Sequence, residues 1–174
     1  MVVADRGLMN FVLTVLRCLM VLNLLCAVIF VAVLGASIFA ESTIREALVE
    51  RSANTDAAAL LLAARISMAL GLVAVPLAQV LLTRLKAIVE TVRAGDPFVQ
   101  LNADRLKLIA WCLLGLQLCD LVFGVVSYSV VSGGEPMSGW TVSLTGWLAV
   151  ALLFVLAQVF AHGTRMRDEL EGTV

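Results

Sequence analysis

Residues 85–111 of the chain read LKAIVETVRAGDPFVQLNADRLKLIAW, and this stretch decides the fold because it separates two apolar halves. Gly95 suits the position after the end of a helix, and Pro97 cannot continue a helix. Asn102 is a good N-cap residue for a following helix, and Asp104 lies in the first turn, where an acid suits the helix dipole. The stretch therefore predicts that one helix ends and another begins within it.

The composition is that of a membrane protein. Hydrophobic residues make up 61% of the 174 residues and charged residues 14%, and the mean hydropathy is +1.03. A typical soluble domain has about 25% charged residues. The charged residues of this chain lie in clusters between long apolar segments, and a soluble core could not bury so much apolar surface.

Four apolar segments are long enough to cross a bilayer core of ~30 Å, which needs about 20 helical residues. The first has no charged residue, and it is too long for the apolar region of a signal peptide, which has roughly 7–15 residues. The helix of the second segment is expected to continue beyond the membrane as an amphipathic turn or two. The segments are residues 18–40, 57–83, 108–131 and 140–161.

These segments predict an all-α membrane protein of one domain. Its four transmembrane helices are expected to form a four-helix bundle of two antiparallel hairpins. A basic loop, residues 84–107, joins the hairpins, and a charged tail, residues 162–174, follows the last helix. The lipid bilayer is therefore the first expected partner.

The distribution of Lys and Arg predicts the orientation, because such residues collect in cytoplasmic loops. On one side of the predicted membrane the only basic residues are Arg45, Arg51 and Arg65, the last of which lies just inside the second span. The other side has nine basic residues: Arg6, Arg17, Arg84, Lys86, Arg93, Arg105, Lys107, Arg165 and Arg167. We therefore expect a bacterial cytoplasmic membrane protein whose two termini and central loop lie in the cytoplasm.

Asp120 is the single position most indicative of function, because an acid inside a transmembrane helix is costly. Its expected partner is Arg65, since the two residues lie at depths that differ by only ~5 Å at ~1.5 Å per helical residue. The carboxylate could act as a proton or ion relay, or it could pair with Arg65 and fix how the second and third helices meet. We favour the pair because one acid with a nearby base makes a poor relay.

A second polar set lies nearer the cytoplasm and takes one amide side chain from each span: Asn23, Gln79, Gln117 and Gln158. Amides hydrogen-bond across helices in lipid, and each such bond contributes ~1 kcal/mol. We expect these side chains to form a polar layer that holds the bundle together. A polar substrate cavity that opens inward is the alternative.

The sequence contains no nucleophile–base pair, P-loop, dinucleotide fingerprint or metal motif. The cysteines lie in apolar segments without C-x-x-C spacing, and the single histidine is at the far end of the chain. We therefore expect no enzymatic activity, no metal site and no cofactor. Direct nucleic-acid binding is not expected either, since orientation and anionic lipid account for the basic loop.

Two stretches carry a resemblance to a known family. The first is GDPF at residues 95–98 followed by NADRLKLIAW at residues 102–111, and the second is FAHGTRMRDELEGTV at residues 160–174. Together with the four spans, they resemble an uncharacterised family of four-span bacterial inner-membrane proteins. The resemblance implies a gene neighbourhood that includes a small helix-turn-helix transcriptional regulator. It transfers no catalytic residues.

This neighbourhood suggests that the protein holds the regulator at the inner membrane surface and so controls its access to DNA. The regulator would dock on the two cytoplasmic stretches. The loop offers Gly95, Asp96, Pro97, Phe98, Asn102 and Arg105, and the tail offers Arg165, Arg167, Asp168, Glu169, Leu170 and Glu171. Phe98 serves neither orientation nor the turn, so it faces the lipid interface or a partner. A tail that only satisfies orientation is the alternative.

Two other classes of function remain open. A small-solute or ion transporter could use the Asp120–Arg65 pair, but four spans would need to assemble into a homo-oligomer to make a pore. The sequence shows no internal repeat of the kind that many transporters have. A structural or immunity-type membrane protein is the other alternative.

Overall fold

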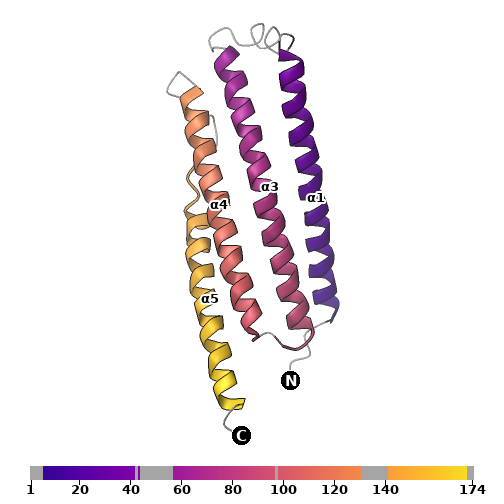
Figure 1. The fold of residues 1–174 in the computed structure, drawn as a ribbon, viewed down its shortest axis with the longest axis vertical. Helices are drawn as coiled ribbons and strands as arrows, with labels where there is room; N and C mark the ends of the chain where they lie inside the picture. The colour runs from indigo at the N-terminus through magenta and orange to yellow at the C-terminus, as the bar shows by residue number, and fades with distance from the viewer. Residues whose placement is uncertain (1–5, 42, 44–56, 97, 131–140, 172–174) are drawn as a thin grey trace.

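The computed structural model describes residues 6–41, 43, 57–96, 98–130 and 141–171, and its regular elements are four long helices (Figure 1). They are α1 (Arg6–Phe39), α3 (Ala57–Arg93), α4 (Gln100–Val130) and α5 (Leu144–Glu171). Each contains a segment long and apolar enough to cross a membrane. The predicted all-α membrane fold is therefore confirmed.

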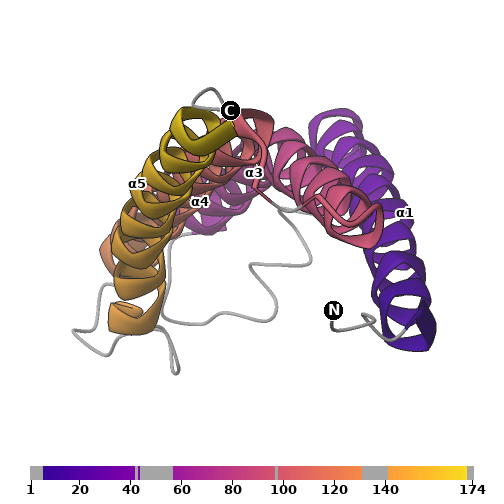
Figure 2. The same ribbon diagram turned by 90° about the horizontal axis from the view of Figure 1, so that it is seen from below.

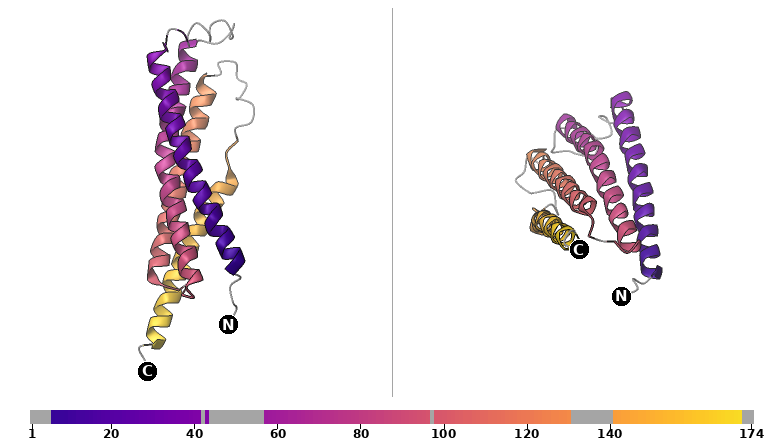
Figure 3. Two further views of the ribbon diagram at one scale, coloured as in Figure 1. Left: turned by 90° about the vertical axis from the view of Figure 1, so that its right-hand side faces the viewer. Right: turned by 60° about the horizontal axis from the view of Figure 1, so that its bottom comes forward.

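The helices stand side by side in chain order, and successive helices run in opposite directions (Figure 1). α1 packs on α3, α3 on α4, and α4 on α5. Seen from one end, the helices form a curved row, with α1 and α5 at its two ends (Figures 2 and 3). Within the described residues α1 contacts neither α4 nor α5. The row is thus open, and the described helices do not surround a common core as the predicted four-helix bundle would.

The open row leaves large apolar side chains on the surface, above all on α1. Phe11 and Val28 are each 66% exposed, and Ile29 is 57% exposed. Such exposure would be unfavourable in water, but lipid tails are as apolar as these side chains, so contact with them has little cost. The surface of the row is therefore suited to a bilayer.

The helices are longer than the predicted spans. α3 contains 37 residues, and at ~1.5 Å per residue it is about 55 Å long, which exceeds a bilayer core of ~30 Å. α3 continues to Arg93, in agreement with the predicted amphipathic extension. α1 begins at Arg6, well before the predicted span, and α5 continues to Glu171. Most of the predicted tail is therefore a continuation of α5 rather than a separate segment.

The turn between α3 and α4 follows the sequence prediction at Gly95, which has a φ angle of +91°. The Gly95 N–H donates to the Val92 carbonyl at 3.1 Å, and the Asp96 N–H donates to the Thr91 carbonyl at 3.2 Å. These bonds satisfy carbonyl groups at the end of α3. Pro97 lies outside the described residues.

Replacing Gly95 with Ala should destabilise the protein by roughly 1 kcal/mol, because a Cβ disfavours a positive φ angle. The matched control is Gly35→Ala in the interior of α1, where a Cβ would also meet nothing within 4 Å. That control should leave stability unchanged or raise it, since Ala favours a helix. Thermal unfolding in detergent measures both variants, and an equal effect of the two would contradict the role of the φ angle.

Candidate functional site

The two stretches that carry the family resemblance meet near the α3–α4 turn, where α3 ends and α4 begins. The Phe98 ring stacks on the Phe160 ring of α5, with their centroids 5.4 Å apart. The Thr164 hydroxyl of α5 donates to Gln100 Oε1 at 3.0 Å, and Thr164 is only 2% exposed. The Phe98 ring also packs on Gly163, where an added Cβ would lie 3.7 Å from the ring, an ordinary van der Waals distance. We call these five residues the junction.

A buried polar cluster lies beside the junction and joins α3 to α4. Asn102 is fully buried, and its Nδ2 donates to Thr91 Oγ1 of α3 at 2.8 Å. Arg105 Nη1 donates to Asn102 Oδ1 at 2.9 Å and to the Ala87 carbonyl at 3.2 Å. A hydrogen bond to a charged group contributes more than one between neutral groups. The cluster therefore fixes the distance between the two helices.

The prediction that Asn102 caps α4 is wrong. α4 begins at Gln100, and the Asn102 N–H already donates to the Val99 carbonyl at 2.8 Å. Because Asn102 lies inside the helix, its side chain is free to point toward α3 and bond with Thr91. Arg105 was expected to fix orientation as a loop residue, and it is instead a half-buried member of the cluster.

The accessible surface around the junction is a mixture of apolar and charged groups. Phe98 is 50% exposed, Leu101 63% and Met166 58%. The charged side chains of Asp104, Lys107, Arg165 and Glu169 are also exposed. Other predicted tail residues lie on the last turns of α5, but their side chains are outside the described part: Arg167, Asp168, Leu170 and Glu171.

The predicted polar layer forms only in part. Asn23 Nδ2 donates to Gln79 Oε1 and to the Val75 carbonyl, each at 3.0 Å, and so joins α1 to α3. Gln117 packs against Gly146 of α5, where an added Cβ would overlap its amide. Gln158 is exposed. The four amides therefore do not line one cavity, and their expected single layer is replaced by separate contacts.

Arg65 pairs with a different acid from the one predicted. Its Nη2 lies 3.0 Å from Glu41 Oε2 and donates to the Ser37 carbonyl at 2.6 Å. Arg65 is on the side of α3 that faces α1. Successive residues of a helix are ~100° apart, so Ser67 falls on the side that faces α4. Arg65 and Asp120 match in depth but not in direction, and the structure does not join them.

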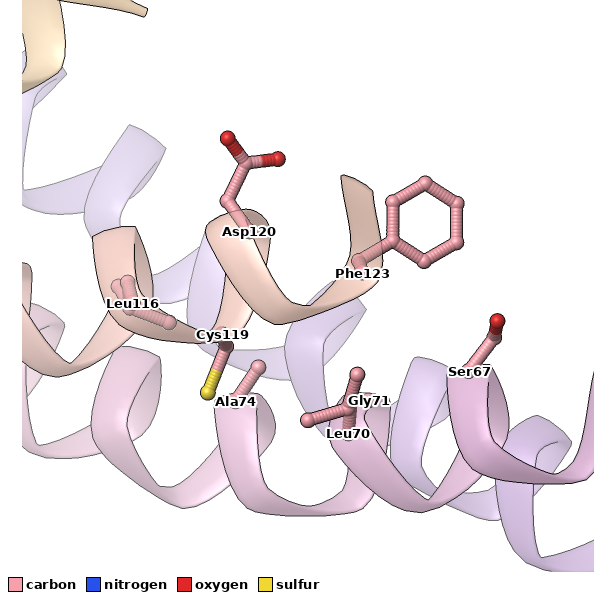
Figure 4. A pocket seen from close by; sticks show the side chains of 8 residues that line it. All are labelled: Ser67, Leu70, Gly71, Ala74, Leu116, Cys119, Asp120 and Phe123. Carbon is pink, nitrogen blue, oxygen red and sulfur yellow. The ribbon is translucent and has the colours of Figure 1, made fainter. Parts of the chain in front are cut away.

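Asp120 instead lies at a hollow of about 260 Å³ between α3 and α4 (Figure 4). Its carboxylate extends away from α3, whereas the Cys119 thiol points toward Ala74 (Figure 4). The walls include Ser67 and Gly71 of α3 and Phe123 of α4. The sequence predicted Asp120 as a site residue because it is an acid in an apolar segment. It did not predict the hollow, which small residues of α3 line.

Removing the amide of Asn102 should lower stability by roughly 1–3 kcal/mol, because Thr91 and Arg105 lose a buried partner. Asn102→Ala is the test variant. Lys107→Gln is the control, since Lys107 is exposed on the next turn of the same helix. Chemical denaturation in detergent should show a large shift for the first variant and almost none for the second. Similar shifts would mean that the cluster does not hold α3 and α4 together.

Double-mutant cycles distinguish the two possible partners of Arg65. Arg65→Gln with Glu41→Gln should show a coupling of roughly 0.2–1 kcal/mol, the range of a partly exposed ion pair. Arg65→Gln with Asp120→Asn should be additive, as expected of residues that share no contact. Thermal unfolding of the single and double variants measures both couplings. A coupling to Asp120 larger than that to Glu41 would contradict the observed arrangement.

Comparison with known protein families matches residues 45–174 to the family described as "Protein of unknown function (DUF2975)". The matched part includes α3, α4 and α5, with the junction and the hollow, and begins after α1. No curated protein and no solved structure matches the chain. The resemblance to an uncharacterised family of four-span proteins is confirmed by the match and by the four apolar helices. Because the match covers more than half of the sequence, the chain belongs to the DUF2975 family of proteins of unknown function.

Proposed function

We propose that this multi-pass membrane protein holds a small DNA-binding regulator at the cytoplasmic face of the bacterial inner membrane. The supporting observation is the junction. Two stretches about 60 residues apart in the sequence, each predicted to be cytoplasmic, contact each other through Phe98 and Phe160 and through Gln100 and Thr164. A continuous surface of this kind can bind one partner with both stretches together.

The charge distribution supports the cytoplasmic assignment of this end. The C-terminal end of α3 and the N-terminal end of α4 lie together with the C-terminal end of α5 (Figure 1). The basic residues of these helix ends are Arg84, Lys86, Arg93, Arg105, Lys107, Arg165 and Arg167. Positive charge of this density beside apolar spans is typical of the cytoplasmic side. Under this proposal both termini of the chain are also cytoplasmic.

The chemistry of the surface defines the partner that would fit it. Phe98, Leu101 and Met166 expose apolar side chains at the charged end of the helices. Aromatic residues and Met are enriched in protein interfaces. Charged residues of both signs, Asp104 and Lys107, flank the apolar groups. A small protein with an apolar patch bordered by complementary charges would fit. The regulator implied by the family resemblance is the candidate that we propose.

The transporter alternative was based on an arrangement that the described residues do not form. It required Asp120 and Arg65 to act together, but Arg65 binds Glu41 and the Ser37 carbonyl. The amide side chains that would have lined a path make separate contacts, and Gln158 faces outward. No described feature favours a structural or immunity-type role over regulator binding.

Affinity purification tests the proposal. Full-length protein in detergent should retain the small helix-turn-helix regulator that the family resemblance leads us to expect in the neighbouring gene. Leu101→Ser should reduce recovery about ten-fold, because it removes an exposed apolar contact of roughly 1–2 kcal/mol. Leu144→Ser is the control, since Leu144 is 79% exposed at the start of α5, 20 residues before Thr164 of the junction. No recovery by the full-length protein would refute the proposal.

A shortened chain measures the contribution of the last turns of α5. A chain that ends at Thr164 keeps the hydrogen bond to Gln100 and removes the charged end of the helix. Lower recovery would assign part of the binding surface to these turns. Recovery equal to that of the full chain would confine the surface to Phe98, Leu101 and their neighbours.

A further inference from the structure

We propose that the hollow beside Asp120 is a binding site for a small organic monocation, such as a quaternary ammonium ion. The site is separate from the junction, so it goes beyond regulator binding. It combines one carboxylate, one aromatic ring and apolar walls on a segment suited to lie within the bilayer.

The carboxylate of Asp120 is available to such a ligand. Asp120 lies inside the apolar segment Gln100–Tyr128 of α4 and is exposed. Within the described part of the chain it makes no ion pair, and Arg65 is bound to Glu41 and the Ser37 carbonyl on another side of α3. Acids inside transmembrane segments typically pair with a positive group or face a water-filled cavity. Because the carboxylate extends away from α3 (Figure 4), a cation at the open rim of the hollow would supply that partner.

The small residues of α3 make the space. Ser67, Gly71 and Ala74 occupy successive turns and line one wall of the hollow. Gly71 cannot be larger without displacing Phe30 of α1, because a Cβ there would lie 2.8 Å from the Phe30 ring. The close packing of α1 on α3 therefore depends on a small residue at this turn.

The size and lining indicate the class of ligand. A volume of about 260 Å³ is below the roughly 300–1,000 Å³ of sites for drug-sized ligands. Leu116 and Phe123 line the wall on α4, and an aromatic face attracts organic cations. Among the described residues no three His, Cys, Asp or Glu side chains are grouped as metal ligands would be. A single carboxylate balances one positive charge, and a weakly hydrated ammonium ion loses little on entering apolar walls.

Equilibrium binding of labelled tetraethylammonium to full-length protein tests the site. The protein is placed in nanodiscs of phosphatidylethanolamine, and binding to empty nanodiscs is subtracted. Asp120→Asn should weaken binding about ten-fold or more through loss of the charge. Asp104→Asn, which removes an exposed acid from the other end of α4, should leave binding unchanged.

A second variant fills the space and keeps the charge. Ala74→Leu should weaken binding to a similar extent while Asp120 is retained, and size-exclusion elution checks that each variant is folded. Loss of binding in both variants but not in Asp104→Asn supports the site. Undiminished binding by Asp120→Asn, or no binding by the wild-type protein at millimolar cation, overturns it. Full displacement by an equal concentration of K⁺ would also overturn the assignment to organic cations.

Discussion

The contact between α3 and α4 is the one on which the rest of the described structure depends. α1 packs on α3 and α5 packs on α4, so each outer helix takes its position from one member of the central pair. Apolar burial gives little drive for helix association in lipid, and close packing and hydrogen bonds carry more of it. The buried Asn102, bonded to Thr91 and Arg105, supplies such bonds at the charged end of this pair. The hollow lies between these two helices, and the junction joins α5 to the residues that follow the turn between them.

The sequence could predict those features that depend on one helix at a time. Long apolar segments identify four membrane helices, and Gly95 marks the end of α3 because its conformation is local. The limits of the helices were less accurate, since charged turns beyond the bilayer continue α1 and α5. The role of Asn102 was also predicted incorrectly from the sequence. Its residue type favours a cap, but the burial that determines its role comes from the neighbouring helix.

Features that depend on the rotation of one helix against another could not be predicted from the sequence. The depths of Arg65 and Asp120 can be counted along each helix, whereas the side from which each projects depends on which faces meet. α1 is apolar around most of its circumference, so no stripe shows which side packs on α3. For the same reason a closed bundle and an open row have similar sequence patterns. The junction was anticipated only as two separate stretches, because their contact joins residues far apart in the chain.

The position of α1 at the edge of the row has a consequence for the order of assembly. A protein chain is made from its N-terminus, so α1 enters the bilayer before α3, the helix on which it packs, has been synthesised. Until then the Asn23 amide lacks the Gln79 and Val75 acceptors that it meets in the finished protein. The arrival of α3 supplies these acceptors and also brings Gly71 beneath Phe30. Synthesis of the second span is thus the step that fixes the first one in place.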